Sequence, residues 1–145
     1  MKNKVIIYGC LGIVLCFIMS IPIVNDYCAY MVEKKLCAAP LPENTQLIDS
    51  VSKAGKLTGN GNGLQYLGAI LIQSELTMEQ LDSYYLHYRE NEWEYLVTVQ
   101  TDRDLSFIEL DHLRFSQEVT ADGYYIVYSW GKGIELYEML DMRGH

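Results

Sequence analysis

Proline and positive charge are both scarce in this 145-residue chain, and cysteine does not occur after position 37. Three prolines are too few for a polyproline or collagen-like protein. Without cysteines, a domain in the second part of the chain must fold without disulfides. Only 11 Lys and Arg stand against 19 Asp and Glu, for a net charge of −8. Nucleic-acid binding needs clustered Lys and Arg, so we expect no nucleic acid as a partner.

What the chain does have is apolar sequence, above all near its N-terminus. Half of the residues are hydrophobic and 21% are charged, which is typical of a globular protein and not of a disordered one. Residues 5–24 contain no charged side chain. As a helix they would extend roughly 30 Å, the thickness of the hydrocarbon core of a bilayer. This segment predicts a transmembrane helix.

The charges that flank this segment predict its orientation. Lys2 and Lys4 precede it together with the amino terminus, whereas the charges just after it sum to zero. By the positive-inside rule, residues 1–4 are cytoplasmic and the C-terminal part is extracytoplasmic. The apolar region of a cleaved signal peptide is usually ~7–15 residues and is followed by a small-x-small site. Here the only similar site, at residues 37–39, lies far downstream. We therefore expect an uncleaved signal anchor in a single-pass protein of the cell membrane.

The sequence after the anchor divides at two prolines. Pro40 and Pro42 disfavour helix at the residues before them. We expect a juxtamembrane linker over residues 25–42 and an extracytoplasmic domain over residues 43–145. Cys28 and Cys37 fall in this linker. If the linker is helical they are ~13 Å apart, too far for a disulfide, and a bond would need a broken helix.

The pattern of the domain predicts an α+β fold. Thr77 and Gln80 form a capping box, with a staple from Leu76 to Leu81, and they predict the start of a helix. Apolar or alternating runs predict strands on both sides of it. The expected strands cover 45–52, 64–74, 93–100 and 124–130, two further runs lie around 105–110 and 112–117, and the tail 134–142 fits a strand or a helical turn. The order β-β-α-β-β-β predicts an antiparallel sheet with one packed helix.

The first part of this domain resembles a group of known proteins. The elements are a short anchor, a proline-containing exit, a strand, the glycine-rich turn 58–63, a second strand, and a helix with Tyr84-Tyr85 followed by Trp93. In this order they resemble uncharacterised, membrane-anchored envelope proteins of Gram-positive bacteria. The resemblance covers most of residues 40–130. It implies fold and location, and it carries over no activity and no catalytic residues.

The residues with catalytic potential are few. His87 falls on the expected helix with Glu90 and Glu94 nearby in sequence, and His112 lies further along. Neither histidine has a metal-ligand spacing, and the chain has no GxSxG elbow and no domain cysteine to act as a nucleophile. We therefore expect no catalytic, cofactor-binding or metal-binding residues, and no cofactor.

Aromatic residues are the most unusual feature of the outer domain. Nine of the twelve tyrosines and both tryptophans lie there. Tyrosine combines an apolar ring with a polar tip, which suits interfaces. We therefore select Tyr124, Tyr125, Tyr128 and Trp130 as a candidate contact surface for a protein or glycan partner. Ordinary packing in a small core is the other interpretation of these residues.

The charge of the outer domain is strongly negative. Residues 40–145 contain seven Lys and Arg against 17 Asp and Glu, a balance of −10. Such a domain is repelled by anionic lipid headgroups and attracts basic partners, so we expect it to stand off the membrane. The sequence thus favours a membrane-anchored binding or accessory module of the cell envelope. The alternatives are a small envelope hydrolase, using His87 and a neighbouring Glu, and an immunity-type inhibitor of a secreted partner.

Overall fold

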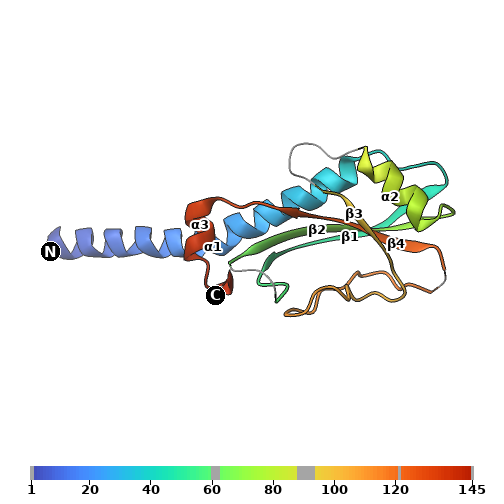
Figure 1. The fold of residues 1–145 in the computed structure, drawn as a ribbon. Coiled ribbons are helices and arrows are strands. Elements are labelled where there is room, and N and C mark those ends of the chain that lie inside the picture. The colour runs from blue at the N-terminus through green and yellow to red at the C-terminus, as the bar shows by residue number, and fades with distance from the viewer. Residues whose placement is uncertain (1, 60–62, 88–93, 121, 145) are drawn as a thin grey trace.

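A long N-terminal helix, a four-stranded antiparallel sheet and two short helices make up the structure (Figure 1). The computed structural model describes residues 2–59, 63–87, 94–120 and 122–144. The elements are α1 (Lys2–Ala38), β1 (Thr45–Gly55), β2 (Gln65–Ser74), α2 (Met78–Leu86), β3 (Leu96–Val99), β4 (Tyr124–Gly131), α3 (Glu135–Leu140) and a 3-10 turn (Met142–Gly144). The fold class is therefore α+β, as the sequence predicts.

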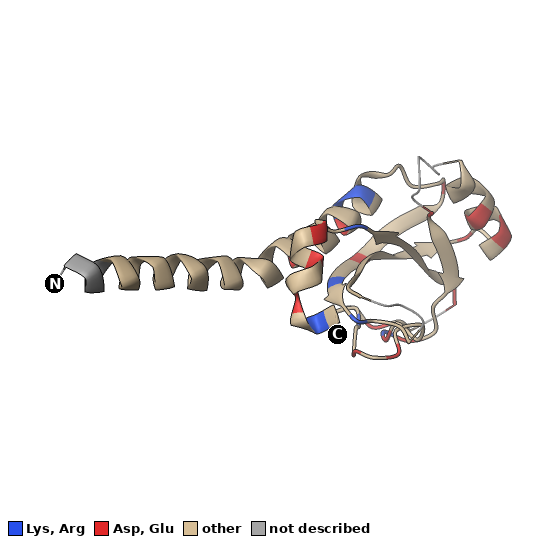
Figure 2. Ribbon diagram, turned by 60° about the vertical axis from the view of Figure 1, so that its left-hand side comes forward, with Lys and Arg blue, Asp and Glu red and all other residues tan. Residues whose placement is uncertain are grey.

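The two halves of α1 have opposite environments. From Ile6 to Met19 every side chain is exposed, and this half protrudes from the rest of the protein without a charged residue (Figure 2). By length and composition, α1 is apolar and long enough to cross a membrane. The second half lies on the sheet. Its buried positions are Ile21, Asn25, Ala29, Val32 and Leu36. They recur every three to four residues, which is the period of one helix face.

The structure corrects the expected linker. Residues 25–38 continue α1 without a break and pack against the sheet, so they belong to the core of the domain. The helix ends at Ala38, just before Pro40, so the prolines do mark its end. Cys28 and Cys37 lie on this one helix and both are free. This agrees with the expectation that a continuous helix holds them too far apart for a disulfide. The apolar sequence of residues 5–24 conceals the amphipathic pattern that begins within it.

The sheet has the strand order β1-β2-β4-β3, and all neighbouring strands are antiparallel. Strand β2 is central. Seven consecutive residues of it, from Tyr66 to Ile72, are buried, which confirms the prediction of a strand covered on both faces. Strand β4 lies beside it, with Ile70 opposite Val127 in the register.

One face of the sheet is covered by α1 and α2. Leu36 of α1 and Leu81 and Tyr85 of α2 pack against Ile70 and Val127 of the strands. The predicted start of α2 is confirmed. The backbone N–H of Gln80 donates to the Thr77 hydroxyl and the Gln80 side chain accepts from the Thr77 backbone N–H, which completes the capping box.

Helix α1 approaches β2 at Gly68 so closely that only a glycine fits. A Cβ atom there would lie 2.7 Å from the carbonyl carbon of Val32 and 2.9 Å from Cα of Glu33. The carboxylate of Glu33 also accepts hydrogen bonds of 2.6 and 2.5 Å from the hydroxyls of Ser50 and Ser52 on β1. The second half of α1 is thus held to two strands by backbone contact and by charge-assisted hydrogen bonds.

The other face is covered by residues 100–120, where a further strand was expected. That prediction was wrong. Within this fully described segment the only ladder contact is a single bridge between Asp104 and Arg114. Leu105, Ile108 and Phe115 are buried against the sheet from an irregular backbone. These residues are three and seven positions apart, whereas the buried residues of a strand recur at every second position. Carboxylate and amide side chains hold the loops instead, including Asp49, which accepts from the backbone N–H groups of residues 116 and 117.

Candidate functional site

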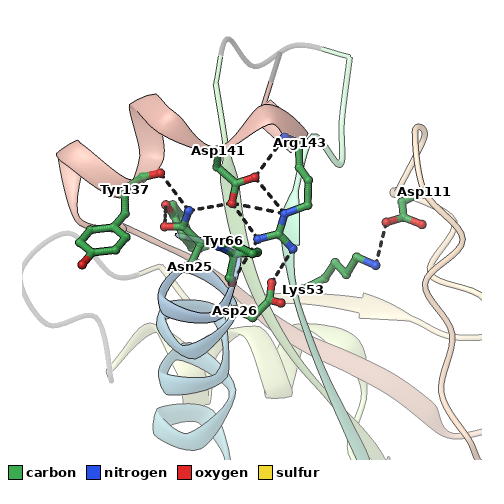
Figure 3. Close-up of polar contacts among 9 residues, drawn as sticks. Asn25, Asp26, Lys53, Tyr66, Asp111, Tyr137, Asp141 and Arg143 are labelled. Carbon is green, nitrogen blue, oxygen red and sulfur yellow. Dashed lines mark hydrogen bonds and ion pairs between the residues drawn. The ribbon is translucent and has the colours of Figure 1, made fainter. Parts of the chain in front are cut away.

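A buried polar network joins α1 to the last residues of the chain, on the side of the domain where the apolar half of α1 protrudes (Figure 3). Its centre is Asn25 of α1, which is fully buried. The amide of Asn25 donates to the carboxylate of Asp141 at 2.8 Å and to the carbonyl of Tyr137 at 3.1 Å. The hydroxyl of Tyr66, at the start of β2, donates to Oδ1 of Asn25 at 2.8 Å. Each polar atom of the Asn25 side chain therefore has a partner.

Arg143 extends this network from the buried side to the surface. Its guanidinium contacts Asp141 through Nε and Nη2, and its Nη1 lies 2.7 Å from Oδ1 of Asp26. Nη2 also donates to the carbonyl of Pro22 at 3.2 Å. A fork-shaped donor held by two carboxylates and a carbonyl fixes the last residues of the chain onto α1.

The charges of this network shift the pKa values of its members. Hydrogen bonds from Arg143, followed by the Asn25 amide, lower the pKa of Asp141 to about 2. The same pairing raises the pKa of Arg143. Burial raises the pKa of Tyr66. At neutral pH, Asp141 is thus a carboxylate and Tyr66 a neutral donor, which are the protonation states that the hydrogen bonds require.

A second ion pair lies next to this network on the surface. Nζ of Lys53, near the end of β1, is 3.1 Å from Oδ2 of Asp111. This pair lowers the pKa of Asp111. Lys53 and Arg143 line one small cleft of about 260 Å³ together with Asp26, Ser52 and Ala54. The one hydroxyl among its described lining residues, that of Ser52, donates to the carboxylate of Glu33 and so takes part in holding α1 on β1. We assign the network a structural role.

The four aromatic residues selected from the sequence do not form one surface. Tyr124, Tyr128 and Trp130 lie on the face of the sheet that residues 100–120 cover. The ring of Tyr128 stacks on Phe107 with centroids 4.3 Å apart, and Trp130 meets the same ring edge-on. Tyr125 lies on the opposite face, where its hydroxyl donates to the carbonyl of Leu76. All four are half-buried, so their packing role is visible and their role in contact stays a prediction.

The two histidines lie in different layers of the molecule. His87 caps the C-terminus of α2, is exposed, and its Nδ1 is 2.8 Å from the Ser83 carbonyl oxygen. His112 is exposed on the segment that covers the other face. The proposed neighbour Glu90 lies outside the described residues. The described residues contain no group of three His, Cys, Asp or Glu that could hold a metal ion.

A groove lies at the end of the sheet opposite the protruding helix. It has a volume of about 550 Å³ and is formed where β1 begins and β2 ends. The lining side chains are polar throughout: Asn44, Thr45, Gln46, Gln73, Ser74, Glu75 and Asp122. We call these residues the distal groove. The hydroxyls of Thr45 and Ser74, both among its lining residues, lie 2.7 Å apart and are hydrogen-bonded to each other. Its two carboxylates are exposed, and no Lys or Arg is among its described lining residues.

Sequence reasoning missed both the polar network and the distal groove. Asn25 was assigned to a linker, although it continues the spacing of Ile21, Ala29 and Val32 on one helix face. That spacing is the signal that could have found it. Nothing local predicts that Asp141 would be its partner. Comparison with protein-family models, with curated proteins and with solved structures finds no match to this chain.

Proposed function

We propose that this protein is a single-pass membrane protein of the cell envelope whose extracytoplasmic domain acts as a binding or accessory module. The observation that supports it is the continuity of α1. One unbroken helix includes both the exposed apolar half and the half that forms part of the core. Such a helix can join a membrane span to a folded domain without a flexible linker. In this proposal residues 5–24 are the anchor, residues 1–4 are cytoplasmic and the domain lies outside.

The same helix supports retention of the anchor. α1 is compatible with a signal anchor or a signal peptide by its composition. The small-x-small site at residues 37–39 follows Ala29, Val32 and Leu36, which are buried in the core. Cleavage there would remove the helix that covers one face of the sheet. We therefore favour the uncleaved anchor. This agrees with the resemblance to membrane-anchored envelope proteins of Gram-positive bacteria.

The anchor can be tested by placing charge in the span. Arginine near the centre of a membrane helix costs about 2.5–3.5 kcal/mol on the insertion scale. We expect Leu11→Arg with Val14→Arg to move the protein out of the carbonate-resistant membrane fraction. The matched control is Leu110→Arg with Val99→Arg, since these residues are equally exposed but lie on the domain. The control should stay in the membrane, and intact mass should show the uncleaved N-terminus. Equal behaviour of both variants would contradict the proposal.

The binding role is supported by the distal groove. It lies at the end of the domain farthest from the anchor, where a partner has free access from outside the cell. Glu75 and Asp122 would favour a basic segment of a protein over a neutral glycan. A photoreactive residue in place of Gln73 should crosslink a partner in native membranes. Glu75→Lys with Asp122→Lys should abolish the crosslink, whereas Glu94→Lys with Glu135→Lys, which changes the net charge equally, should not. Loss in both variants, or in neither, would count against the groove.

A further inference from the structure

The last residues of the chain expose an unusual number of apolar side chains. Met139 is 67% exposed and Met142 is 82% exposed. Among the described residues outside α1, half of the exposed large hydrophobic ones fall within this one segment of nine residues: Ile134, Leu136, Met139, Leu140 and Met142. We call them the C-terminal apolar patch. Soluble surfaces seldom concentrate apolar side chains in this way, and such patches mark contact sites.

The orientation of α3 turns this patch away from the rest of the protein. The ring of Tyr137 faces α1, with its centroid 5.9 Å from that of Phe17. The Glu138 carboxylate lies on the side of the sheet, near Gly63, two residues before β2. Leu136, Met139 and Leu140 occupy positions i, i+3 and i+4, which share one helix face. This face points neither to α1 nor to the sheet, and it is exposed.

The position of α3 along α1 supplies a second, independent argument. Val5 to Phe17 is 13 residues, so the uncharged helix reaches only ~20 Å before it meets Tyr137 of α3. A bilayer core needs roughly 30 Å, or about 20 residues. The remaining ~10 Å of span, up to residue 24, lies alongside α3 and is partly covered by it (Figure 1). If α1 crosses the membrane, α3 lies at the level of the outer leaflet.

We propose that the C-terminal apolar patch inserts into the outer leaflet of the bilayer as a second membrane contact beside α1. This rests on the proposed function, because it requires α1 to be the span. The apolar face of α3 meets acyl chains. Arg143 contacts Asp26 and the carbonyl of Pro22, at the outer end of the apolar span. There its guanidinium reaches the level of the lipid headgroups, as interfacial arginines do. The occupant is the lipid itself, since Tyr137 of the same short helix contacts Phe17 in the exposed apolar half of α1.

A second membrane contact beside α1 would restrict how the domain tilts and rotates relative to the bilayer. A single helix allows the domain to tilt and rotate, whereas a helix and an adjacent patch define a plane. The domain is then held against the membrane with the distal groove facing outward. This differs from the expectation from net charge that the domain stands off the membrane. Two of the acidic residues, Glu135 and Glu138, lie on α3 itself, but outside the helix face of Leu136, Met139 and Leu140. Insertion depends on this apolar face and not on the net charge of the domain.

The test uses the full-length protein in vesicles of phosphatidylcholine and phosphatidylglycerol, with single tryptophans as depth probes. Trp93 and Trp130 are replaced by Phe, and one tryptophan is introduced as Met139→Trp, Leu110→Trp or Val14→Trp. Lipids brominated on the acyl chains quench tryptophans that contact them. We expect blue-shifted emission and strong quenching for Met139→Trp, similar to Val14→Trp. Leu110→Trp, exposed on the segment that covers the far face of the sheet, should emit as in water and stay unquenched.

The outcomes separate the inference from the proposed function. Quenching at position 14 without quenching at position 139 would overturn the second contact and leave the anchor intact. No quenching at position 14 would overturn the anchor, and with it the second contact. A blue-shifted but unquenched tryptophan at position 139 would show that protein, such as a second copy of the chain, covers the patch, and the lipid proposal would then be wrong.

Discussion

The side chain of Asn25 donates a 2.8 Å hydrogen bond to the carboxylate of Asp141, although 116 residues separate them in the sequence. Asn25 stands on α1 just after the apolar span, and Asp141 follows α3 directly. This one bond therefore closes the domain at the point where the chain leaves the membrane in our proposal. Because both groups are buried, the bond also fixes the position of the C-terminal apolar patch relative to α1.

Removing Asn25 should be costly. In the Asn25→Ala variant the Tyr66 hydroxyl loses its acceptor and Asp141 loses a donor, and each buried group left without a partner costs about 1–3 kcal/mol. We expect a lower free energy of unfolding of the full chain in detergent, measured with urea by near-UV circular dichroism. Gln117→Ala, an exposed site, is the control and should change little. Equal stability of the two variants would show that the network is dispensable.

The low pKa of Asp141 predicts a loss of stability in acid. Its pKa is about 2 in the folded protein, against about 3.9 for an ordinary Asp. The unfolded chain therefore binds the proton first as the pH falls, and the stabilisation present above pH 4 is lost between pH 4 and 2. Asp141→Asn should be less stable at pH 7 and should show a shallower decline in acid. An unchanged acid slope in this variant would assign the decline to other carboxylates.

The close approach of α1 to β2 predicts a contrast between two glycines. Gly68→Ala places a Cβ atom against the backbone of Val32 and Glu33, so α1 must shift, and overpacking of this kind typically costs about 1–3 kcal/mol. Gly55→Ala, on neighbouring β1, meets only a Leu57 methyl group at 3.6 Å. We expect unfolding at lower urea for the first variant and nearly unchanged unfolding for the second. If both were neutral, α1 would not be packed on the sheet as described.

The start of α2 offers a comparison of cap and core. Thr77→Ala removes the side-chain acceptor of the capping box and should cost about 1 kcal/mol. Leu81→Ala opens a cavity at a fully buried position and should cost more, about 2–5 kcal/mol. Both values come from the same urea experiment. A larger loss for Thr77→Ala would mean that the buried face of α2 is assigned incorrectly.

The features that the sequence predicted are those with a local signal. The capping box of Thr77 and Gln80 needs only four residues, and from Tyr66 to Ile72 strand β2 has no polar side chain except the tyrosine hydroxyl. The irregular segment 100–120 was misread, because buried residues such as Leu105 and Phe115 are apolar in a loop just as in a strand. The linker was misread because the uncharged run conceals where the amphipathic half of α1 begins.

The helical spacing could have shown that Asn25 is buried, but the partners of Asn25 and the distal groove have no local signal in the sequence. The partners of Asn25 come from β2 and from the end of the chain, and only the folded arrangement brings them together. The groove is formed by the meeting of two strand ends, far apart in sequence, with residue 122. The composition of β4 suggested one aromatic surface, yet its aromatic side chains divide between the two faces of the sheet.

The most direct test of the account is the topology of the full chain in living cells. The four native cysteines are replaced by alanine, and a single cysteine is introduced as Thr101→Cys, which is exposed on the domain, or as Asn3→Cys before the span. A membrane-impermeant maleimide is then applied to intact protoplasts. We predict labelling of the Thr101→Cys variant in intact protoplasts and of the Asn3→Cys variant only after permeabilisation. Labelling in the reverse order would place the domain inside the cell and contradict the account.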